Sequence, residues 1–287
     1  MNPATPKTGP APAAQPGKAI AGDVLDFPWR EKRAAMIIAH PGHELRVHHW
    51  LETAKPATLV LTDGSGRTLR SRLESTTKIL QCAGATAGPV YGRFSDADIY
   101  QAMLAGKLDV FLALMEEVVD WLVAERIDYV AGDALEGYNT SHEVCRFLTG
   151  AACEWAARRI GRAIRNFDFL LMGRPDACPP PLQAGAICLR LEPAAVERKL
   201  AAAKDYPELK HEVELALKEF GPAAFAVEWL RPVTNNAGLR PAAAQPYYEI
   251  YGERQRAAGH YQNVIREQEH LLPLARALWA QAEHEGH

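Results

Sequence analysis

The chain has 287 residues, a hydrophobic content of 48%, a charged content of 23% and a formal net charge of -3. This length allows one large α/β domain or two small ones, and the composition is ordinary for a soluble globular protein. The small net charge argues against binding to nucleic acid or to an anionic membrane surface, and no apolar run approaches the roughly 20 residues that span a bilayer.

The N-terminal residues 1–22 are rich in alanine and proline and lack the continuous apolar segment of a signal peptide, so we expect a disordered tail. The five cysteines are odd in number and show no Cys-x-x-Cys spacing. This usage is typical of reduced thiols, and it argues against a disulfide scaffold or a cysteine zinc site. We therefore expect a cytoplasmic protein.

Apolar runs alternate with helical patterns along the rest of the chain, as in a mostly parallel sheet with crossover helices. In chain order, the predicted elements are strand 34–39, helix 43–53, strand 57–62, helices 70–83 and 104–125, strand 127–131, helix 142–159 with Ser141 as its N-cap, strand 184–191, and helices 193–204, 207–219 and 255–284. We predict a Rossmann-like α/β domain over residues 23–192, with helices on both faces of the sheet. A helical extension over residues 193–287 is expected to pack on the same domain.

Three histidines fall where this topology brings side chains together. His40 ends the first predicted strand, His43 begins the following helix, and His142 begins the helix after a later strand. Ligands of open α/β sheets bind at the carboxyl ends of the strands. His40 and His43 can therefore turn their imidazoles toward one point, and His142 occupies the corresponding place after the later strand. Three imidazoles with an open fourth position form a catalytic zinc arrangement. The alternative is that they are polar loop residues that cap helices.

Four segments around these histidines occur in a defined order: HPGHE at 40–44, LTDG at 61–64, an Arg/Glu helix at 70–84, and GYNTSH at 137–142. Together they resemble the motifs of the PIG-L/LmbE-like zinc-dependent N-deacetylases, in which the first segment reads HPDDE and the last contains HPDH. The resemblance covers about residues 34–165. It implies a metal-dependent hydrolase of carbohydrate metabolism that cleaves an acyl C–N bond, with an N-acylated amino sugar or a related small metabolite as substrate.

The resemblance implies that zinc, or another divalent metal, is bound by His40, His43 and His142, of which His43 replaces an aspartate. Gly42 stands in place of the family's general base, and a glycine cannot accept a proton. Asn139 replaces a histidine that assists the tetrahedral intermediate. An asparagine can still donate a hydrogen bond to a developing oxyanion, but it cannot shuttle protons.

The identity of the general base is therefore open. Glu44 and Asp63 are favoured because they are nearest in sequence to the expected metal, and Asp133, Glu136 and Glu143 are further candidates. Structural roles compete with each assignment, since Glu44 and Glu143 suit a first helical turn and Asp63 suits an Asp-Gly turn. The alternative functions are a catalytically degenerate family member that binds a sugar or nucleotide-like ligand, and a metal enzyme with a changed reaction.

The segment 246–253, PYYEIYGE, is unusually aromatic. Aromatic rings beside carboxylates can form a sugar platform or a subunit contact, and a packed irregular segment is the structural alternative. We expect a small-molecule substrate and a homo-oligomer built through this C-terminal region, with neither nucleic acid nor membrane as a partner.

Overall fold

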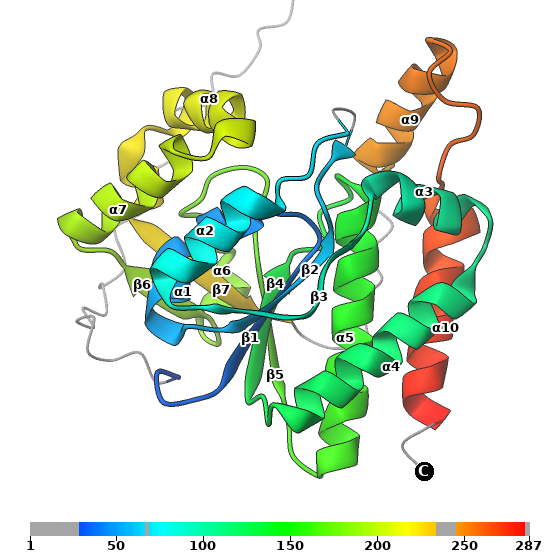
Figure 1. Ribbon diagram of the computed structural model, residues 1–287, viewed down its shortest axis with the longest axis horizontal. Coiled ribbons are helices and arrows are strands. Elements are labelled where there is room, and N and C mark those ends of the chain that lie inside the picture. The colour runs from blue at the N-terminus through cyan, green and yellow to red at the C-terminus, as the bar shows by residue number, and fades with distance from the viewer. Residues whose placement is uncertain (1–28, 67–68, 234–244, 285–287) are drawn as a thin grey trace, which may run out of the picture.

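The computed structural model describes residues 29–66, 69–233 and 245–284 (Figure 1). The predicted N-terminal tail, residues 1–22, lies outside the described residues. Among the described residues, no helix combines the length and the apolar character needed to cross a membrane.

The described residues form a seven-stranded mixed sheet with the order β3-β2-β1-β4-β5-β7-β6. Its strands are β1 (Ala34–Ile38), β2 (Ala57–Thr62), β3 (Thr86–Phe94), β4 (Tyr129–Asp133), β5 (Arg165–Phe169), β6 (Ile187–Arg190) and β7 (Val227–Pro232). The first five strands are parallel, and β7 runs antiparallel to both β5 and β6. The prediction of a mostly parallel α/β sheet is confirmed.

Burial on both faces explains why β1, β2 and β4 were predicted from the sequence. Every residue of β1 and β4 is buried, as expected for central strands covered by helices on both sides. By contrast, Val90 is the one buried residue of β3, and in β5 only Phe167 and Phe169 are buried, so both strands are less continuously apolar. These two strands and β7 were not predicted from the sequence.

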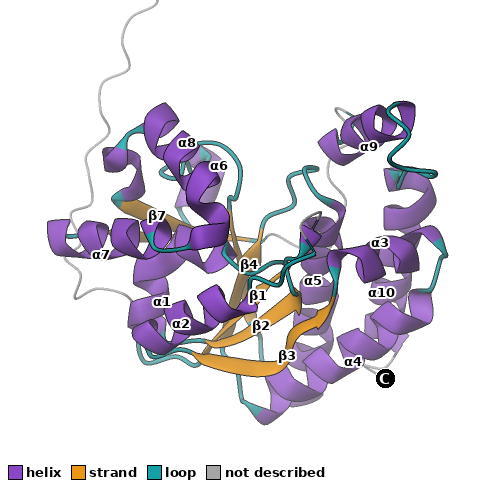
Figure 2. Ribbon diagram, turned by 45° about the horizontal axis from the view of Figure 1, so that its top comes forward, coloured by secondary structure: helices purple, strands orange, loops and turns teal. Residues whose placement is uncertain are grey.

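Helices cover both faces of the sheet (Figures 1 and 2). In chain order they are the 3-10 helix η2 (His43–Val47), α1 (His48–Ala54), α2 (Leu73–Ala83), α3 (Asp96–Leu104), α4 (Leu108–Ala124), α5 (Thr140–Ile160), α6 (Pro180–Gln183), α7 (Pro193–Lys204), η4 (Pro207–Leu209), α8 (Lys210–Phe220), η5 (Pro222–Phe225), α9 (Tyr247–Ala257), the π-helix η6 (Glu267–Leu271) and α10 (Leu272–His284). One apolar core joins α1 and α2 to one face of the sheet, and a second joins α4, α5 and α10 to the other.

Several predicted boundaries were wrong. The predicted helix 104–125 begins later, as α4 at Leu108, because the chain turns at Gly106 with a φ of 61°, and Leu104 is the last residue of α3. The predicted helix 255–284 is divided among α9, η6 and α10. The aromatic segment 246–253 is mostly helical, since α9 begins at Tyr247. Residues beyond 192 also contribute β7 to the sheet, so the extension is not purely helical, and the boundary at 192 stays a prediction.

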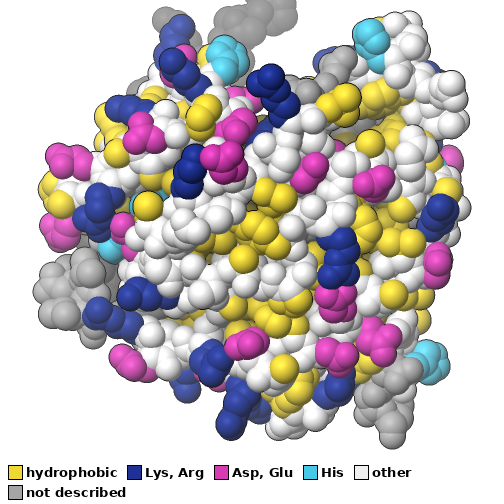
Figure 3. All heavy atoms as spheres, viewed as in Figure 1, with side chains coloured by type: hydrophobic (Ala, Val, Ile, Leu, Met, Phe, Trp, Pro, Cys, Tyr) yellow, Lys and Arg dark blue, Asp and Glu magenta, His cyan; other side chains and the backbone are white. Residues whose placement is uncertain are grey.

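The face shown in Figure 3 carries basic and acidic side chains interspersed with hydrophobic ones. This mixture fits the small net charge of the chain. A broad single-sign surface, which would attract a polyanion or an anionic membrane, is not seen on this face.

Candidate metal centre

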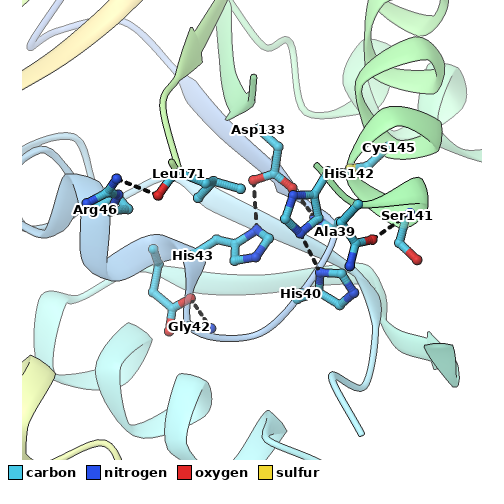
Figure 4. A network of polar contacts seen from close by, with 12 residues as sticks. Ala39, His40, Gly42, His43, Arg46, Asp133, Ser141, His142, Cys145 and Leu171 are labelled. Carbon is cyan, nitrogen blue, oxygen red and sulfur yellow. Dashed lines mark hydrogen bonds and ion pairs between the residues drawn. The ribbon is translucent and has the colours of Figure 1, made fainter. Parts of the chain in front are cut away.

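The three histidines meet at the carboxyl edge of the two central strands (Figure 4). His40 follows β1, His43 is the first residue of η2, and His142 lies in the first turn of α5, which follows β4. Each residue offers one nitrogen, and these nitrogens lie within 4.8 Å of one another. His142 Nε2 is 3.0 Å from His40 Nδ1. This group can hold a metal ion.

Asp133 holds the outer side of the His43 ring. Its Oδ1 lies 2.9 Å from His43 Nδ1, and its Oδ2 accepts a hydrogen bond of 2.7 Å from the Ala39 backbone N–H. With Nδ1 engaged by the carboxylate, Nε2 of His43 is the nitrogen left for the centre. A carboxylate behind an imidazole is the arrangement that orients metal-ligating histidines and raises their basicity.

Asp96 orients the His40 ring in the same way that Asp133 orients the His43 ring. Its Oδ1 lies 2.7 Å from His40 Nε2 and also accepts a hydrogen bond from Thr62 Oγ1, while its Oδ2 accepts one from the Gly66 N–H. The sequence analysis missed this residue. Asp96 lies beside Ser95, which forms a capping box with Asp98 at the start of α3, so the local pattern indicates a helix cap and not a site.

Burial favours the neutral, metal-binding form of two of the imidazoles, His43 and His142. Burial lowers the pKa of His43, and Asp133 opposes this shift only in part. Burial also lowers the pKa of His142, and the neighbouring His43 and His40 add to the effect. The Nδ1 of His142 is buried without a hydrogen-bond partner among the described residues. Neutral imidazoles suit zinc and other borderline divalent metals, so the residues fit such an ion.

The three predicted catalytic residues occupy different surroundings. Glu44 is buried, and its carboxylate accepts hydrogen bonds from the Gly42 N–H and from Thr76 Oγ1, while burial raises its pKa to about 7. Asp63 Oδ1 accepts a hydrogen bond from the Ser65 N–H and so stabilises the turn after β2. Asn139 caps α5.

The cap of α5 corrects the predicted start of this helix. The helix begins at Thr140, and its N-cap is Asn139, whose Oδ1 accepts a hydrogen bond of 2.8 Å from the Ser141 N–H. Ser141 is therefore inside the helix and is not its cap. Since the side-chain oxygen of Asn139 is used by the cap, its amide nitrogen is the group left as a donor.

The remaining candidate bases hold backbone segments near the site. Glu136 accepts hydrogen bonds from the N–H groups of Leu171 and Met172. Glu143 Oε1 accepts hydrogen bonds from the N–H groups of Glu136 and Gly137 and so shapes the loop before α5.

Both the positive φ of Gly42 and its contact with Leu209 favour glycine at this position. Its φ is 103°, and a Cβ atom at this position would lie 2.3 Å from Leu209 Cδ1 and 3.5 Å from Tyr206 Cζ. The η4 segment therefore covers the loop between His40 and His43. At the position where the resembled family carries its base, this chain has an apolar contact.

Comparisons with known proteins leave the family open. No protein-family model and no characterised protein sequence matches the chain. Among solved structures, it is similar to a triple mutant of a deacetylase involved in the teicoplanin biosynthetic pathway, with 13% sequence identity, a TM-score of 0.39, and coverage of 71% of this chain and 98% of that one. So low a TM-score does not establish a common fold.

Proposed function

We propose that the protein is a metal-dependent hydrolase with a Rossmann-like frame, which cleaves the acyl C–N bond of an N-acylated amino sugar or a related small metabolite in the cytoplasm. The observation that carries the proposal is the convergence of three imidazole nitrogens within 4.8 Å at the carboxyl edge of the sheet. The order of the motifs around them, which resembles that of the PIG-L/LmbE-like deacetylases, supports the reaction class.

His40, His43 and His142 would hold the ion. A zinc or similar divalent ion bound there supplies a Lewis acid for the acyl carbonyl and lowers the pKa of water to about 7. Asp96 and Asp133 keep the first two imidazoles in one orientation and one tautomer, which preserves the geometry of the donor set through the reaction.

The reaction requires two further groups, one for the developing oxyanion and one for proton transfer. Asn139 would donate a hydrogen bond from its amide nitrogen to the developing oxyanion. Glu44 or Asp63 would take the proton of the attacking water and pass it to the amine nitrogen as the C–N bond breaks. Glu44 is next to His43, but its carboxylate already accepts hydrogen bonds from the Gly42 N–H and from Thr76, whereas Asp63 Oδ1 accepts one from the Ser65 N–H.

One observation favours a second candidate function, the binding of a sugar or nucleotide-like ligand without hydrolysis. The apolar contact between Leu209 and Gly42 fills the place where the resembled family has its base. If neither Glu44 nor Asp63 serves as a base, the centre would bind its ligand and leave the C–N bond intact.

The test begins with elemental analysis of the purified chain and of His43→Ala and His142→Ala, with His211→Ala as the control because His211 is exposed on α8. We expect near-stoichiometric zinc in the wild type and in the control, and its loss from both site variants. The same proteins are then assayed for acetate release from N-acetylated amino sugars. A wild type that binds no metal when zinc is supplied contradicts the proposal. Metal binding with tight ligand binding and no acetate release favours the second function.

A further inference from the structure

Five tyrosine rings form a continuous line that starts beside the histidines. The Tyr138 ring lies 6.3 Å from the His142 ring, centroid to centroid, and 5.2 Å from the Tyr247 ring, to which it is parallel within 4°. The line continues through Tyr251, Tyr261 and Tyr100, with successive centroid separations of 6.2, 6.4 and 5.4 Å. The rings come from the loop before α5, from α9, from the segment after α9, and from α3.

The two rings nearest the site are open to solvent. Tyr138 is 38% exposed and Tyr247 is 43% exposed, and they are two of the five large hydrophobic side chains that are exposed among the described residues. A stacked pair of exposed rings leaves apolar area in water that a ligand can cover, while the phenol hydroxyls add polar contacts. Their place next to His142 makes them a candidate surface for the substrate.

The line is held by contacts outside the rings themselves. The Tyr247 N–H donates a hydrogen bond of 2.7 Å to the Gly137 carbonyl, which ties the start of α9 to the loop of Tyr138. At the far end, the Tyr100 hydroxyl donates to the Asn263 carbonyl at 2.9 Å. Tyr247 and Tyr251 are four residues apart on α9 and share one helical face. A surface held in this way loses little conformational entropy when a ligand binds.

The charges near α9 favour a neutral ligand over a polyanion. Arg266 forms ion pairs with Glu253 and Glu249, and Arg256 pairs with Glu253 at 2.7 Å. These guanidinium groups are already neutralised by carboxylates. A single-stranded nucleic acid, which also stacks on aromatic rings, needs a basic groove along its phosphates. Sugar rings need only the aromatic faces and hydrogen-bonding groups.

We infer that Tyr138, Tyr247 and Tyr251 form a binding track for a saccharide of several rings. The ring with the N-acyl group would contact the exposed surface of Tyr138 beside the histidines, and the following rings would contact Tyr247 and Tyr251. This inference rests on the proposed function and narrows its substrate from a single amino sugar to an oligosaccharide or a glycan chain.

The test is calorimetric titration of the full-length chain, as isolated, with glucose oligomers of one to four β-1,4-linked rings, which are neutral. These carry no acyl group, so hydrolysis does not contribute to the heat. We expect the affinity to rise about three- to tenfold for each added ring up to three rings. Tyr247→Ala and Tyr251→Ala should remove the gain from the added rings and leave the affinity for one ring unchanged. Tyr247→Phe keeps the ring and should keep the gain.

Three results would overturn the track. The first is an affinity that does not depend on the number of rings, or a gain that survives Tyr247→Ala. The second is a dimer, detected by sedimentation, that Tyr247→Ala dissociates without changing oligosaccharide binding. The third is tight binding of polyuridylate that Tyr247→Ala abolishes. Zinc-dependent acetate release from N-acetylated monosaccharides distinguishes the two proposals, because it persists if only the track is wrong and is absent if only the hydrolase function is wrong.

Discussion

At the scale of single residues, His43 has a partner, Asp133, that fixes the orientation of its ring. An imidazole has two different nitrogens, and only a defined tautomer turns a lone pair toward a metal. The contact between Asp133 Oδ1 and His43 Nδ1 fixes that choice, and the bond from the Ala39 N–H holds the carboxylate in place. A carboxylate ligand, as in the resembled family, needs no such choice.

Asp133→Asn should weaken metal binding without removing any imidazole. Loss of a carboxylate behind a ligating histidine typically lowers metal affinity by about 10- to 100-fold. Competition with a chromophoric zinc chelator measures the affinity directly. Asp120→Asn is the matched control, because Asp120 is exposed and forms its ion pair with Arg159 at the surface. Equal affinities for the two variants would contradict the orienting role of Asp133.

Glu44→Gln and Asp63→Asn separate the two candidate bases. General acid–base catalysis contributes roughly 10²–10⁴-fold to a rate, so the variant that removes the base should lower kcat by about that factor and leave the zinc content unchanged. The other variant should change kcat only modestly, since it loses a loop contact. Steady-state kinetics of acetate release decides between them, and two unaffected variants would show that neither carboxylate is the base.

Gly42→Ala should destabilise the protein because the new Cβ meets Leu209 at a positive φ. The left-handed backbone alone costs a residue with a Cβ about 1–2 kcal/mol, and the overlap adds to this. Urea unfolding of Gly42→Ala, of Leu209→Ala and of the double variant measures the two contributions. The double variant should lose less free energy of unfolding than the sum of the single variants. Strict additivity would mean that the Leu209 contact does not constrain position 42.

At the scale of elements, a buried ion pair joins β7 and α7 to the start of α1. Glu228 accepts hydrogen bonds from the N–H groups of His49 and Trp50. These groups belong to the first turn of α1 and have no partner within the helix. Lys199 Nζ lies 2.9 Å from the same carboxylate and donates to the Arg46 carbonyl. His43 is the first residue of η2, and α1 follows η2 directly. The Lys199–Glu228 pair therefore anchors the segment that carries His43.

Lys199→Met should lower the free energy of unfolding by about 3–5 kcal/mol, because it leaves Glu228 charged, buried and without its counter-ion. Arg198→Met is the neighbouring control, since the Arg198–Glu52 pair lies at the surface and its loss should cost about 0–1 kcal/mol. Chemical denaturation of both variants, and of Lys199→Met combined with Glu228→Gln, gives the comparison. If the combined variant is no more stable than Lys199→Met alone, the unpaired carboxylate is not the source of the loss.

At the scale of the whole molecule, the candidate centre joins two strand ends of the sheet through three separate elements. An ion bound by His40, His43 and His142 would bind the folded chain and not the unfolded one, and so would stabilise the fold. At a free zinc concentration of 100 times the Kd, the gain is about 2.7 kcal/mol, which raises Tm by on the order of 5 °C. Thermal unfolding with and without zinc measures it. His142→Ala should abolish the shift, and a shift of the same size in this variant would place the zinc elsewhere.

Much of this organisation is predictable from the chain. The continuous apolar runs of β1, β2 and β4 are distinctive because these strands are covered on both faces. The three histidines were expected to meet because each lies after the carboxyl end of a strand, His40 and His43 after β1 and His142 after β4. By contrast, β3, β5 and β7 are half exposed, and their mixed sequences do not show the periodicity of a strand. The break between α3 and α4 depends on Gly106. A single glycine is compatible with a helical sequence pattern, so Gly106 did not predict the break.

The alternation of strands and helices and the polar residues at the strand ends can be predicted from the chain, because both follow from local patterns of apolar and polar side chains. The partners of those polar residues depend on the folded molecule. Asp96 reaches His40 across 56 positions, Asp133 reaches His43 across 90, and Leu209 fills the space beside Gly42 from 167 positions away. The five tyrosines likewise form one line only after α3, α5 and α9 are placed together. Such contacts depend on the packing of elements distant in sequence, which no local pattern encodes.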